Sequence, residues 1–248
     1  MRVVYPPPTS PAPFTSRKVF AAAHVAAVAG ADGVPVIDWE STLRFREHLW
    51  AHGFGVAEAM DTAQRGMGLS WEQARELIAR TAARAAEAGR LDALACGAGT
   101  DQLADGGPHP LRAIIDAYAE QVAFVQATGA QVILMASRAL AVSARGPRDY
   151  LEVYGELVRQ AERPVILHWL GEAFDPALRA YWGGGFDDAA ATVLELIDRS
   201  GGQVDGVKLS VLDEGREKWL RRRLPAGVRL YTGDDFNYAS LIRGDADG

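Results

Sequence analysis

Short apolar runs and longer amphipathic runs alternate along most of this chain. An apolar run of roughly four to eight residues predicts a buried strand, whereas apolar residues spaced three and four apart predict a helix. The pattern predicts seven strands, within residues 18–27, 54–60, 92–99, 131–138, 164–170, 204–211 and 228–234. Helices are expected between them, within residues 38–53, 70–89, 109–129, 149–162, 187–202 and 214–227.

The ends of the expected helices carry the residues that helix ends favour. Asp38 and Ser70 precede two of them, in the position where a side chain can accept hydrogen bonds from the first free backbone N–H groups. Most of the helical runs end at glycine, which adopts the left-handed conformation wanted just after a helix. These signals support the boundaries that the hydrophobic pattern predicts.

Alternating strands and helices predict an α/β fold with parallel strands joined by right-handed crossovers. The stretch CGAGTDQ, residues 96–102, contains Gly-x-Gly but lacks the third glycine of a dinucleotide-binding turn. The pattern therefore favours a TIM (β/α)8 barrel over a Rossmann sheet. Residues 1–16 are expected to form an extended Pro-rich arm, and residues 17–248 the barrel domain.

The barrel is expected to lack its last unit in this chain. Only 14 residues follow Asp234 at the end of the seventh predicted strand, and residues 236–248 are not expected to supply an eighth. An open sheet edge invites pairing. We therefore expect another chain or a missing segment to pair with this edge, and we expect a homo-oligomer.

Composition excludes several classes of protein. The formal net charge of −6 argues against nucleic-acid binding, which favours a basic face. No apolar run approaches the roughly 18 residues of a membrane span, and the first residues lack the apolar core of a secretory signal. A single cysteine, Cys96, cannot form an internal disulfide. We expect a cytoplasmic protein that binds neither nucleic acid nor membrane.

One lysine stands inside an apolar strand. The chain has 26 lysines and arginines, and only Lys18, Lys208 and Lys218 are lysines. Strand side chains alternate between faces, so Lys208 lies opposite the face of Val207 and Leu209 and is expected to point into the barrel near a strand end. A desolvated amine binds its proton less tightly and attacks carbonyl groups more readily. An internal ion pair with a structural role is the alternative.

GVKLS, residues 206–210, contains this lysine. The stretch resembles the strand that carries the Schiff-base lysine in the dihydrodipicolinate synthase and N-acetylneuraminate lyase superfamily of class I aldolase-type barrels. LYTGDDFNYASLI, residues 230–242, is similar to the seventh-strand segment, and residues 59–78 occupy the position of a carboxylate-binding loop and the helix after it. Residues 129–140 and 163–174 correspond to the fourth and fifth strands. The match is best with an uncharacterised dihydrodipicolinate synthase-like branch.

The resemblance implies that Lys208 forms an imine with the substrate. It also implies a loop in which two threonines bind a carboxylate; Thr62 is kept, whereas Ala63 replaces the second threonine and Asp61 the glycine before Thr62. Arg65 replaces a glutamate of this loop, either as a clamp for an anionic group or as a solvated cation.

The fourth strand departs from the family pattern as well. Ser137 and Arg138 stand where the family has its proton-shuttling tyrosine. Imine formation by Lys208 stays possible without that tyrosine, but the proton relay must then differ from the family's.

Other polar residues at predicted strand ends are candidates for binding and proton transfer. His168 has a suitable intrinsic pKa for proton transfer, although a hydrogen-bonded core histidine fits equally. Glu58 and Asp61 flank the end of the second strand as candidate acids, and Asp61 alternatively caps its loop. Asp234 follows the seventh strand, where it contacts substrate or holds the loop.

The favoured function is a Schiff-base-forming lyase or aldolase that acts on a small oxo-acid or sugar-acid carbonyl compound and needs no cofactor. Lys208 would form the imine, and His168 would move protons. One alternative is a metal-dependent barrel that uses Glu58, His168 and Asp234 as ligands. Another is a non-catalytic barrel that binds a metabolite.

Overall fold

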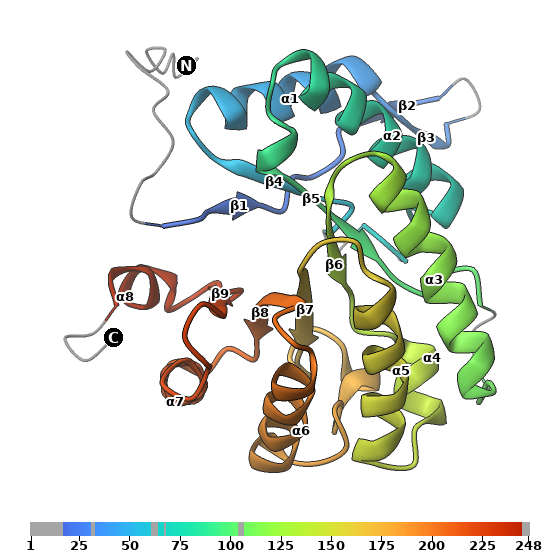
Figure 1. Cartoon of the computed structure of the whole chain (residues 1–248). Coiled ribbons are helices and arrows are strands. Elements are labelled where there is room, and N and C mark those ends of the chain that lie inside the picture. The colour runs from blue at the N-terminus through green and yellow to red at the C-terminus, as the bar shows by residue number, and fades with distance from the viewer. Residues whose placement is uncertain (1–16, 31–32, 61–63, 67, 104–106, 245–248) are drawn as a thin grey trace. The chain divides into compact units, whose positions relative to one another are not determined.

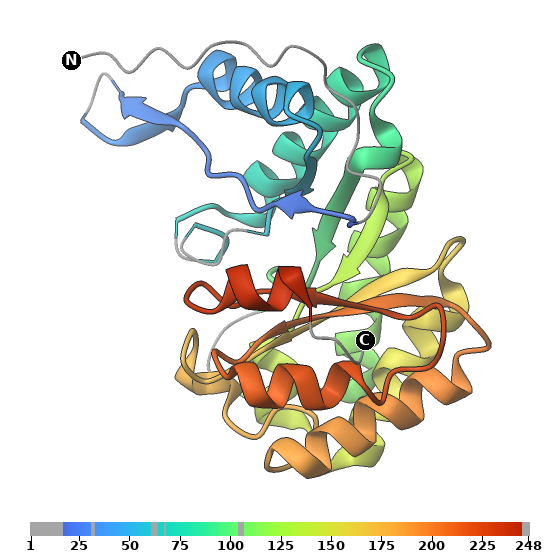
Figure 2. The same ribbon diagram turned by 90° about the vertical axis from the view of Figure 1, so that its left-hand side faces the viewer.

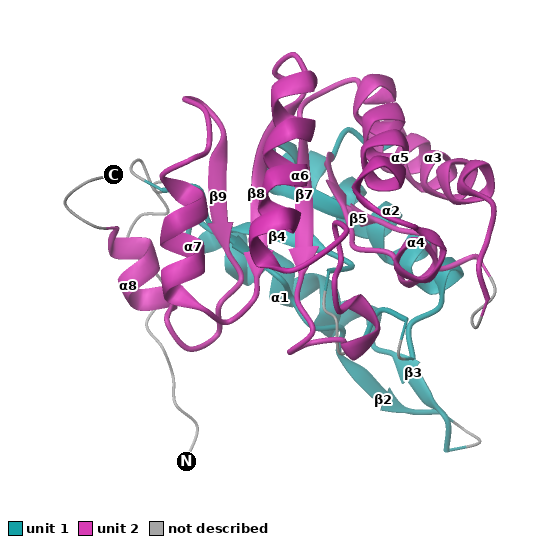
Figure 3. Cartoon of the chain, turned by 90° about the horizontal axis from the view of Figure 1, so that it is seen from below, with its two compact units in different colours: residues 1–96, 128–130 teal, residues 97–127, 131–248 magenta. Residues whose placement is uncertain are grey.

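The computed structural model of the protein describes residues 17–30, 33–60, 64–66, 68–103 and 107–244. The chain forms two compact units, coloured in Figure 3. Unit 1 comprises residues 1–96 and 128–130, and unit 2 comprises residues 97–127 and 131–248. The predicted Pro-rich arm, residues 1–16, lies outside the described residues, and the prediction of one barrel domain over residues 17–248 stays a prediction.

Unit 1 contains the first strands and two long helices. Its elements are β1 (Phe20–Ala21), β2 (Ala27–Ala29), β3 (Pro35–Ile37), α1 (Trp39–Ala51), β4 (Gly55–Glu58), α2 (Trp71–Glu87), the 3-10 turn η1 (Leu91–Ala93) and β5 (Leu94–Ala98), which runs on into unit 2. Strand β4 pairs in parallel with β1 and with β5, whereas β2 and β3 form an antiparallel hairpin. The parallel pairing follows the prediction; the hairpin was not predicted.

The first predicted strand is shorter than its apolar pattern suggested. Only Phe20–Ala21 joins the sheet as β1. Beyond it, side chains rather than a neighbouring strand bind the backbone: Arg46 binds the carbonyl oxygens of Ala23 and His24, and Gln64 binds the N–H and carbonyl of Val25. These side chains take the place of a neighbouring strand for the backbone groups that they bind.

Unit 2 contains the remaining strands and helices. They are α3 (Leu111–Ala127), β6 (Gln131–Leu134), α4 (Arg138–Ser143), α5 (Pro147–Gln160), β7 (Val165–Leu170), η2 (Pro176–Leu178), α6 (Phe186–Arg199), β8 (Val204–Ser210), α7 (Glu214–Arg221), β9 (Arg229–Thr232) and α8 (Tyr238–Arg243). Strands β6, β7, β8 and β9 pair in parallel, in chain order. The later strands run side by side in orange to red in Figure 2.

One face of the unit 2 sheet is covered by helices. Val207 and Leu209 on β8 are fully buried, and Trp169, the register partner of Leu209, stacks on Phe186 of α6 with ring centroids 5.4 Å apart. Lys208 points to the opposite face, because successive strand residues alternate. The structure thus confirms the alternation predicted for this strand.

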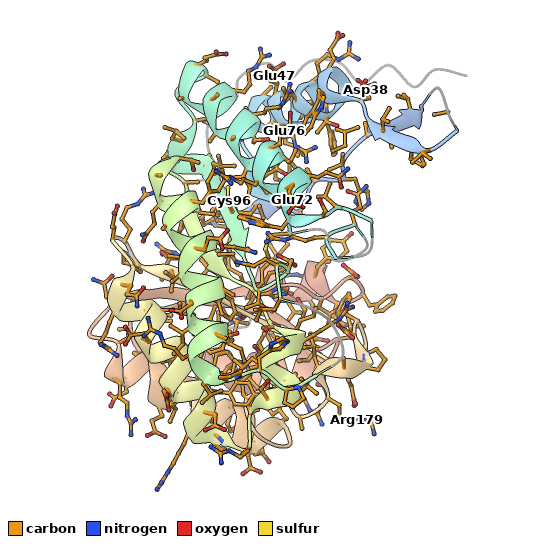
Figure 4. The ribbon with its side chains drawn as sticks, turned by 90° about the vertical axis from the view of Figure 1, so that its right-hand side faces the viewer. Asp38, Glu47, Glu72, Glu76, Cys96 and Arg179 are labelled. Atoms are coloured by element: carbon orange, nitrogen blue, oxygen red, sulfur yellow. The ribbon has the colours of Figure 1, made fainter. Side chains whose placement is uncertain are left out.

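Both predicted helix caps form. The side chain of Asp38 accepts a hydrogen bond from the N–H of Ser41 at the start of α1, where Figure 4 labels it. Ser70 and Gln73 form a reciprocal capping box at the start of α2. Each cap satisfies backbone donors that the first helical turn leaves free, so the helices begin where the sequence predicted.

The described part of the chain end contains no further strand. Residues 236–244 hold α8 and the residues next to it, as the prediction for this tail required. Among the described residues, none of the helices combines the length and apolar character that crossing a bilayer requires. The architecture is an α/β fold in which parallel strands and helices alternate.

Candidate active site

Lys208 and His168 lie side by side on adjacent strands of unit 2. They are register partners in the parallel pairing of β8 with β7, so their side chains leave the same face of the sheet. Lys208 is partly buried, and His168 is 1% exposed. This is the face opposite to that covered by α6.

The environment of His168 keeps its imidazole neutral. Burial, and then the charge of Lys208, hold the pKa of His168 well below its usual value of 6.5. Its Nδ1 atom is buried and has no hydrogen-bond partner among the described residues. The Nε2 atom lies 3.5 Å from the hydroxyl oxygen of Ser210. The same causes make this imidazole a weak base, so it can carry a proton from the neighbouring amine only transiently.

Ser210 extends this pair along β8. It lies two residues after Lys208 on the same face and is 2% exposed. A side chain at Gly233 would place its Cβ 2.0 Å from the Ser210 hydroxyl oxygen, so only glycine leaves room for this hydroxyl. The backbone N–H of Gly233 donates to the carbonyl of Leu209 at 2.8 Å, which holds the turn after β9 against β8.

A tyrosine on β9 borders the same face. Tyr231 is the register partner of Lys208, and its hydroxyl donates to the carboxylate of Asp205 at 2.6 Å. Its ring covers Gly206, where an added Cβ would lie 2.8 Å from the ring. Burial raises the pKa of the Tyr231 phenol, and the hydrogen bond to Asp205 raises it further. The phenol is therefore neutral. Its ring borders the candidate site on the side of Asp205 and Gly206, which precede Lys208 on β8.

Ser137 belongs to a buried network of hydroxyl groups at the end of β6. Its hydroxyl pairs with that of Thr100 at 2.7 Å and accepts from the N–H of Leu140, the latter as the cap of α4. The Ser137 N–H donates to the hydroxyl of Tyr181, which in turn pairs with that of Tyr154 at 2.8 Å. The tyrosine hydroxyls are buried, and burial raises the pKa of each.

Two further residues of unit 2 that the sequence predicts to contact substrate, Arg138 and Asp234, bind other protein groups in this structure. Arg138 is half exposed and forms an ion pair with Asp175 at 2.6 Å. The carboxylate of Asp234 accepts from the N–H groups of Phe236 and Asn237 and from the Asn237 side chain, at 2.7–2.9 Å. Burial raises the pKa of Asp234, but these hydrogen bonds outweigh burial and lower it. Of the two roles that the sequence allowed for Asp234, its contacts favour the loop-holding one.

Glu58 has a structural role in unit 1. Its carboxylate binds the guanidinium of Arg46 through two contacts of 2.9 Å and also accepts from the Thr81 hydroxyl at 2.7 Å and from the N–H of Ala59 at 3.0 Å. Arg46 belongs to α1 and Thr81 to α2, so the side chain of Glu58 points to the helices that pack on β4. Its oxygens are used there, so its contacts favour a structural role over the predicted contact with substrate.

The loop after β4 is described in part. Asp61 and Thr62 lie outside the described residues. Arg65 is 6% exposed, donates to the carbonyl of Ala59 at 3.1 Å and lies over the ring of Trp71 at 5.5 Å. It is therefore a buried cation of unit 1 rather than the solvated one that the sequence also allowed.

Cys96, labelled in Figure 4, is the register partner of Glu58 on β5. The thiol is fully buried, and its pKa is raised by burial and by the charge of Glu58. A thiol in this state is unreactive, in agreement with the absence of any predicted role for it.

The described residues favour no metal-binding cluster. No group of three or more His, Cys, Asp or Glu side chains among them is arranged to hold a metal ion. Two of the three ligands proposed for the metal-dependent alternative, Glu58 and Asp234, use their oxygens in the contacts above. A groove of about 410 Å³ in unit 2 is lined by α3, α5 and α6, on the helix side, and none of the predicted site residues lines it.

Comparison with known proteins places the chain in a family. The model of a family described as protein of unknown function (DUF993) matches residues 4–248. The chain belongs to the DUF993 family. No curated protein matches its sequence.

Two solved structures share the fold of this DUF993 chain. Dihydrodipicolinate synthase from Oceanobacillus iheyensis is 16% identical, with a TM-score of 0.60 over 86% of this chain and 59% of that one. YagE, a prophage protein of the dihydrodipicolinic acid synthase family from E. coli K12, solved in complex with pyruvate, is 16% identical, with a TM-score of 0.61 over 92% of this chain and 67% of that one. This DUF993 chain therefore spans 59% of the length of the synthase, and at such identity the likeness concerns the fold.

Two residues of this candidate site, Ser210 and Tyr231, are not among those that the sequence predicts. Strand alternation places Ser210 on the same face as Lys208, so its position could be predicted from the sequence. Tyr231 depends on the register between β8 and β9, for which the chain carries no local signal.

Proposed function

We propose that this chain is a Schiff-base-forming lyase of the class I aldolase type that acts on a small oxo-acid or sugar-acid carbonyl compound. The observation that carries the proposal is the pairing of Lys208 with the buried, neutral His168 on adjacent strands. An amine must lose its proton before it attacks a carbonyl carbon. A neutral imidazole beside it is a base that can take up that proton.

The chemistry follows from these groups. The Nζ atom of Lys208 bonds to the carbonyl carbon, and the carbonyl oxygen leaves as water together with the two protons of the amine. The proton that His168 took from the amine returns to the imine nitrogen, and the protonated imine draws in the electrons of the carbon–carbon bond one atom removed. That bond breaks as the hydroxyl on the departing carbon loses its proton and becomes the carbonyl of the released fragment, and a proton is delivered to the carbon that is left. Water then hydrolyses the imine and frees Lys208. His168 is the proposed carrier of protons in these steps, and the hydroxyl of Ser210 is its contact towards the ligand.

The proposed substrate class rests on the comparisons and on the loop after β4. YagE was solved with pyruvate, which makes pyruvate the first oxo acid to test on this chain. Thr62 and Arg65 are proposed to hold the anionic group, because the sequence around them resembles a carboxylate-binding loop. At the end of β6, Ser137 is proposed to contact the substrate.

Trapping of the imine tests the proposal directly. The full-length protein is incubated with pyruvate or with one of a panel of related oxo acids, reduced with borohydride, and mapped by peptide mass spectrometry. We expect one stable adduct, on the peptide that contains Lys208. Lys208→Arg should abolish it, because a guanidinium does not form this imine. Lys18→Arg and Lys218→Arg are matched controls and should leave it unchanged.

Other outcomes separate the alternatives. Exhaustive chelation should leave adduct formation intact, whereas its loss would favour the metal-dependent alternative. Absence of an adduct with every oxo acid, in a protein that still binds one of them by calorimetry, would refute the lyase and favour a metabolite-binding barrel.

A further inference from the structure

A buried carboxyl group lies in the part of unit 2 formed by α7, β9 and α8, which we call the C-terminal corner. Leu220 of α7 and Leu241 of α8 are buried there. Arg221 on α7 donates to the carbonyl of Leu241 at 2.9 Å, and Ser240 on α8 donates to Glu214 on α7 at 2.6 Å. These contacts hold α7 and α8 together beside β9.

Glu217 on α7 is fully buried within this corner. Its exposed fraction is 0%, and neither carboxylate oxygen has a partner at hydrogen-bond distance among the residues that the structure describes, although the Thr232 hydroxyl is near enough to influence it. A buried carboxylate without a partner costs several kcal/mol, whereas the protonated acid costs far less. Glu217 therefore fits its position as a neutral acid.

The groups around Glu217 act on its pKa in both directions, with a net increase. Burial is the largest influence and raises its pKa from 4.5 to about 7. The hydroxyl of Thr232 and the charge of Arg221 lower this pKa, whereas the charges of Asp234 and Glu214 raise it. Together, burial and the two carboxylates outweigh the groups that favour the anion.

Among the groups that shift the pKa of Glu217, Arg221 is the cation, and Arg229 of β9 is paired with Asp205 at 2.6 Å. Lys218 is committed to Glu214 at 2.7 Å, and α6 meets α7 through the ring of Phe186, which contacts the ring of Trp219 and the guanidinium of Arg216. The contact from α8 to Glu214 is the neutral hydroxyl of Ser240.

We propose that Glu217 is a proton-controlled latch of the C-terminal corner: the neutral acid keeps α7 packed on β9, and its ionisation releases α7. The turn after β9 carries the effect to the sheet, because the N–H of Gly233 binds the carbonyl of Leu209 at 2.8 Å and Gly233 lies against Ser210. Opening of the latch loosens the support of the strand that carries Lys208. The latch does not depend on the proposed lyase activity.

The sign of the pH dependence follows from the direction of the shift. The proton is bound more tightly when α7 is packed than when it is released, so the stabilisation is complete below the ordinary pKa of 4.5 and is lost as the pH rises towards about 7. The opening equilibrium of α7 should rise about tenfold per pH unit within this window and level off above it.

Hydrogen–deuterium exchange of the full-length protein between about pH 5 and 8 tests the latch. Protection factors, corrected for the intrinsic pH dependence of exchange, are compared for peptides that cover residues 214–221 and 229–232. We expect protection of both to fall with pH and then level off, while peptides from α5 stay constant. Glu217→Gln keeps the shape of the neutral acid and should remove the pH dependence. Glu195→Gln, on the exposed surface of α6, is the matched control and should retain it.

Two results would overturn the latch. One is constant corrected protection of α7 in the wild-type protein across this pH range. This measurement does not depend on whether a variant folds. The other is a Glu217→Gln protein with the same pH profile as the wild type. Imine trapping tests the lyase and hydrogen–deuterium exchange tests the latch, so either proposal can fail while the other stands.

Discussion

The Glu58–Arg46 pair of unit 1 joins a strand to a helix, and the His168–Lys208 pair of unit 2 joins two adjacent strands; the two pairs differ in how fully their hydrogen-bonding groups are used. All five N–H donors of Arg46 have acceptors, and both oxygens of Glu58 accept two hydrogen bonds each. His168 instead has one buried ring nitrogen without a partner among the described residues and one at the limit of hydrogen-bond distance.

The difference distinguishes scaffold from candidate chemistry. A buried charge with a full set of partners is stable only in one arrangement and holds elements together, here α1 and α2 on β4. A buried polar group with an unused atom costs stability, and it is tolerated where a ligand or a proton transfer uses that atom. By this criterion, Glu58 is the scaffold residue and His168 is the better candidate for the site.

Removal of one partner from the scaffold pair should have the largest effect. Arg46→Met leaves the carboxylate of Glu58 buried without its cation, and we expect the free energy of unfolding to fall by about 3–5 kcal/mol. Urea unfolding followed by circular dichroism measures this change. The double variant Arg46→Met/Glu58→Leu should recover most of the loss. A single variant as stable as the wild type would contradict the structural role of the pair.

Substitution in the site pair should affect chemistry more than stability. We expect His168→Gln to slow the formation of the borohydride-trappable imine about 100-fold, because the proton acceptor beside Lys208 is lost. Single-turnover trapping measures the rate, and Lys218→Arg serves as the control. An unchanged rate would remove His168 from the mechanism and leave it as a core residue.

The same variant has a pH signature. The pKa of His168 is lowered in the folded protein, so its contribution to stability is present above about pH 6.5 and is lost as the pH falls through the folded value. His168→Gln should flatten the part of the stability profile that declines towards acid. Chemical unfolding at a series of pH values compares the two proteins.

Loss of one hydrogen bond from the scaffold pair should have a smaller effect than loss of the cation. Thr81→Val removes the hydroxyl that donates to Glu58 at 2.7 Å and keeps the shape of the side chain. A hydrogen bond to a charged group contributes about 2 kcal/mol, and unfolding free energies should show a loss of that order. A loss as large as that of Arg46→Met would mean that the hydroxyl, rather than the guanidinium, dominates the cluster.

The exposed ion pair between Arg138 and Asp175 should contribute least. Exposed pairs contribute below about 1 kcal/mol, so Arg138→Gln should scarcely change the unfolding transition. If the variant instead abolishes imine trapping while its stability is unchanged, Arg138 contacts the substrate, as the sequence predicted, and the ion pair is a resting arrangement.

Much of the fold and part of the site were predictable from local pattern. The apolar runs located the strands from β4 onwards, and the caps at Asp38 and Ser70 located two helix starts. Alternation along β8 placed Lys208 opposite the helix-covered face. The sequence did not predict the hairpin of β2 and β3. Its residues are mostly exposed, so no buried apolar face indicates that the two short strands pair.

Residue type and spacing by themselves determined the alternating α/β pattern, the helix caps and the face of Lys208, because each depends on neighbours within a few residues along the chain. Only the tertiary structure decided which polar groups are satisfied. Glu58 and His168 both stand near the ends of apolar strands, and nothing nearby in sequence distinguishes them. Their partners, Arg46 and Thr81 for one and Lys208 and Ser210 for the other, lie 12 to 42 residues away and meet them only through strand register and helix packing.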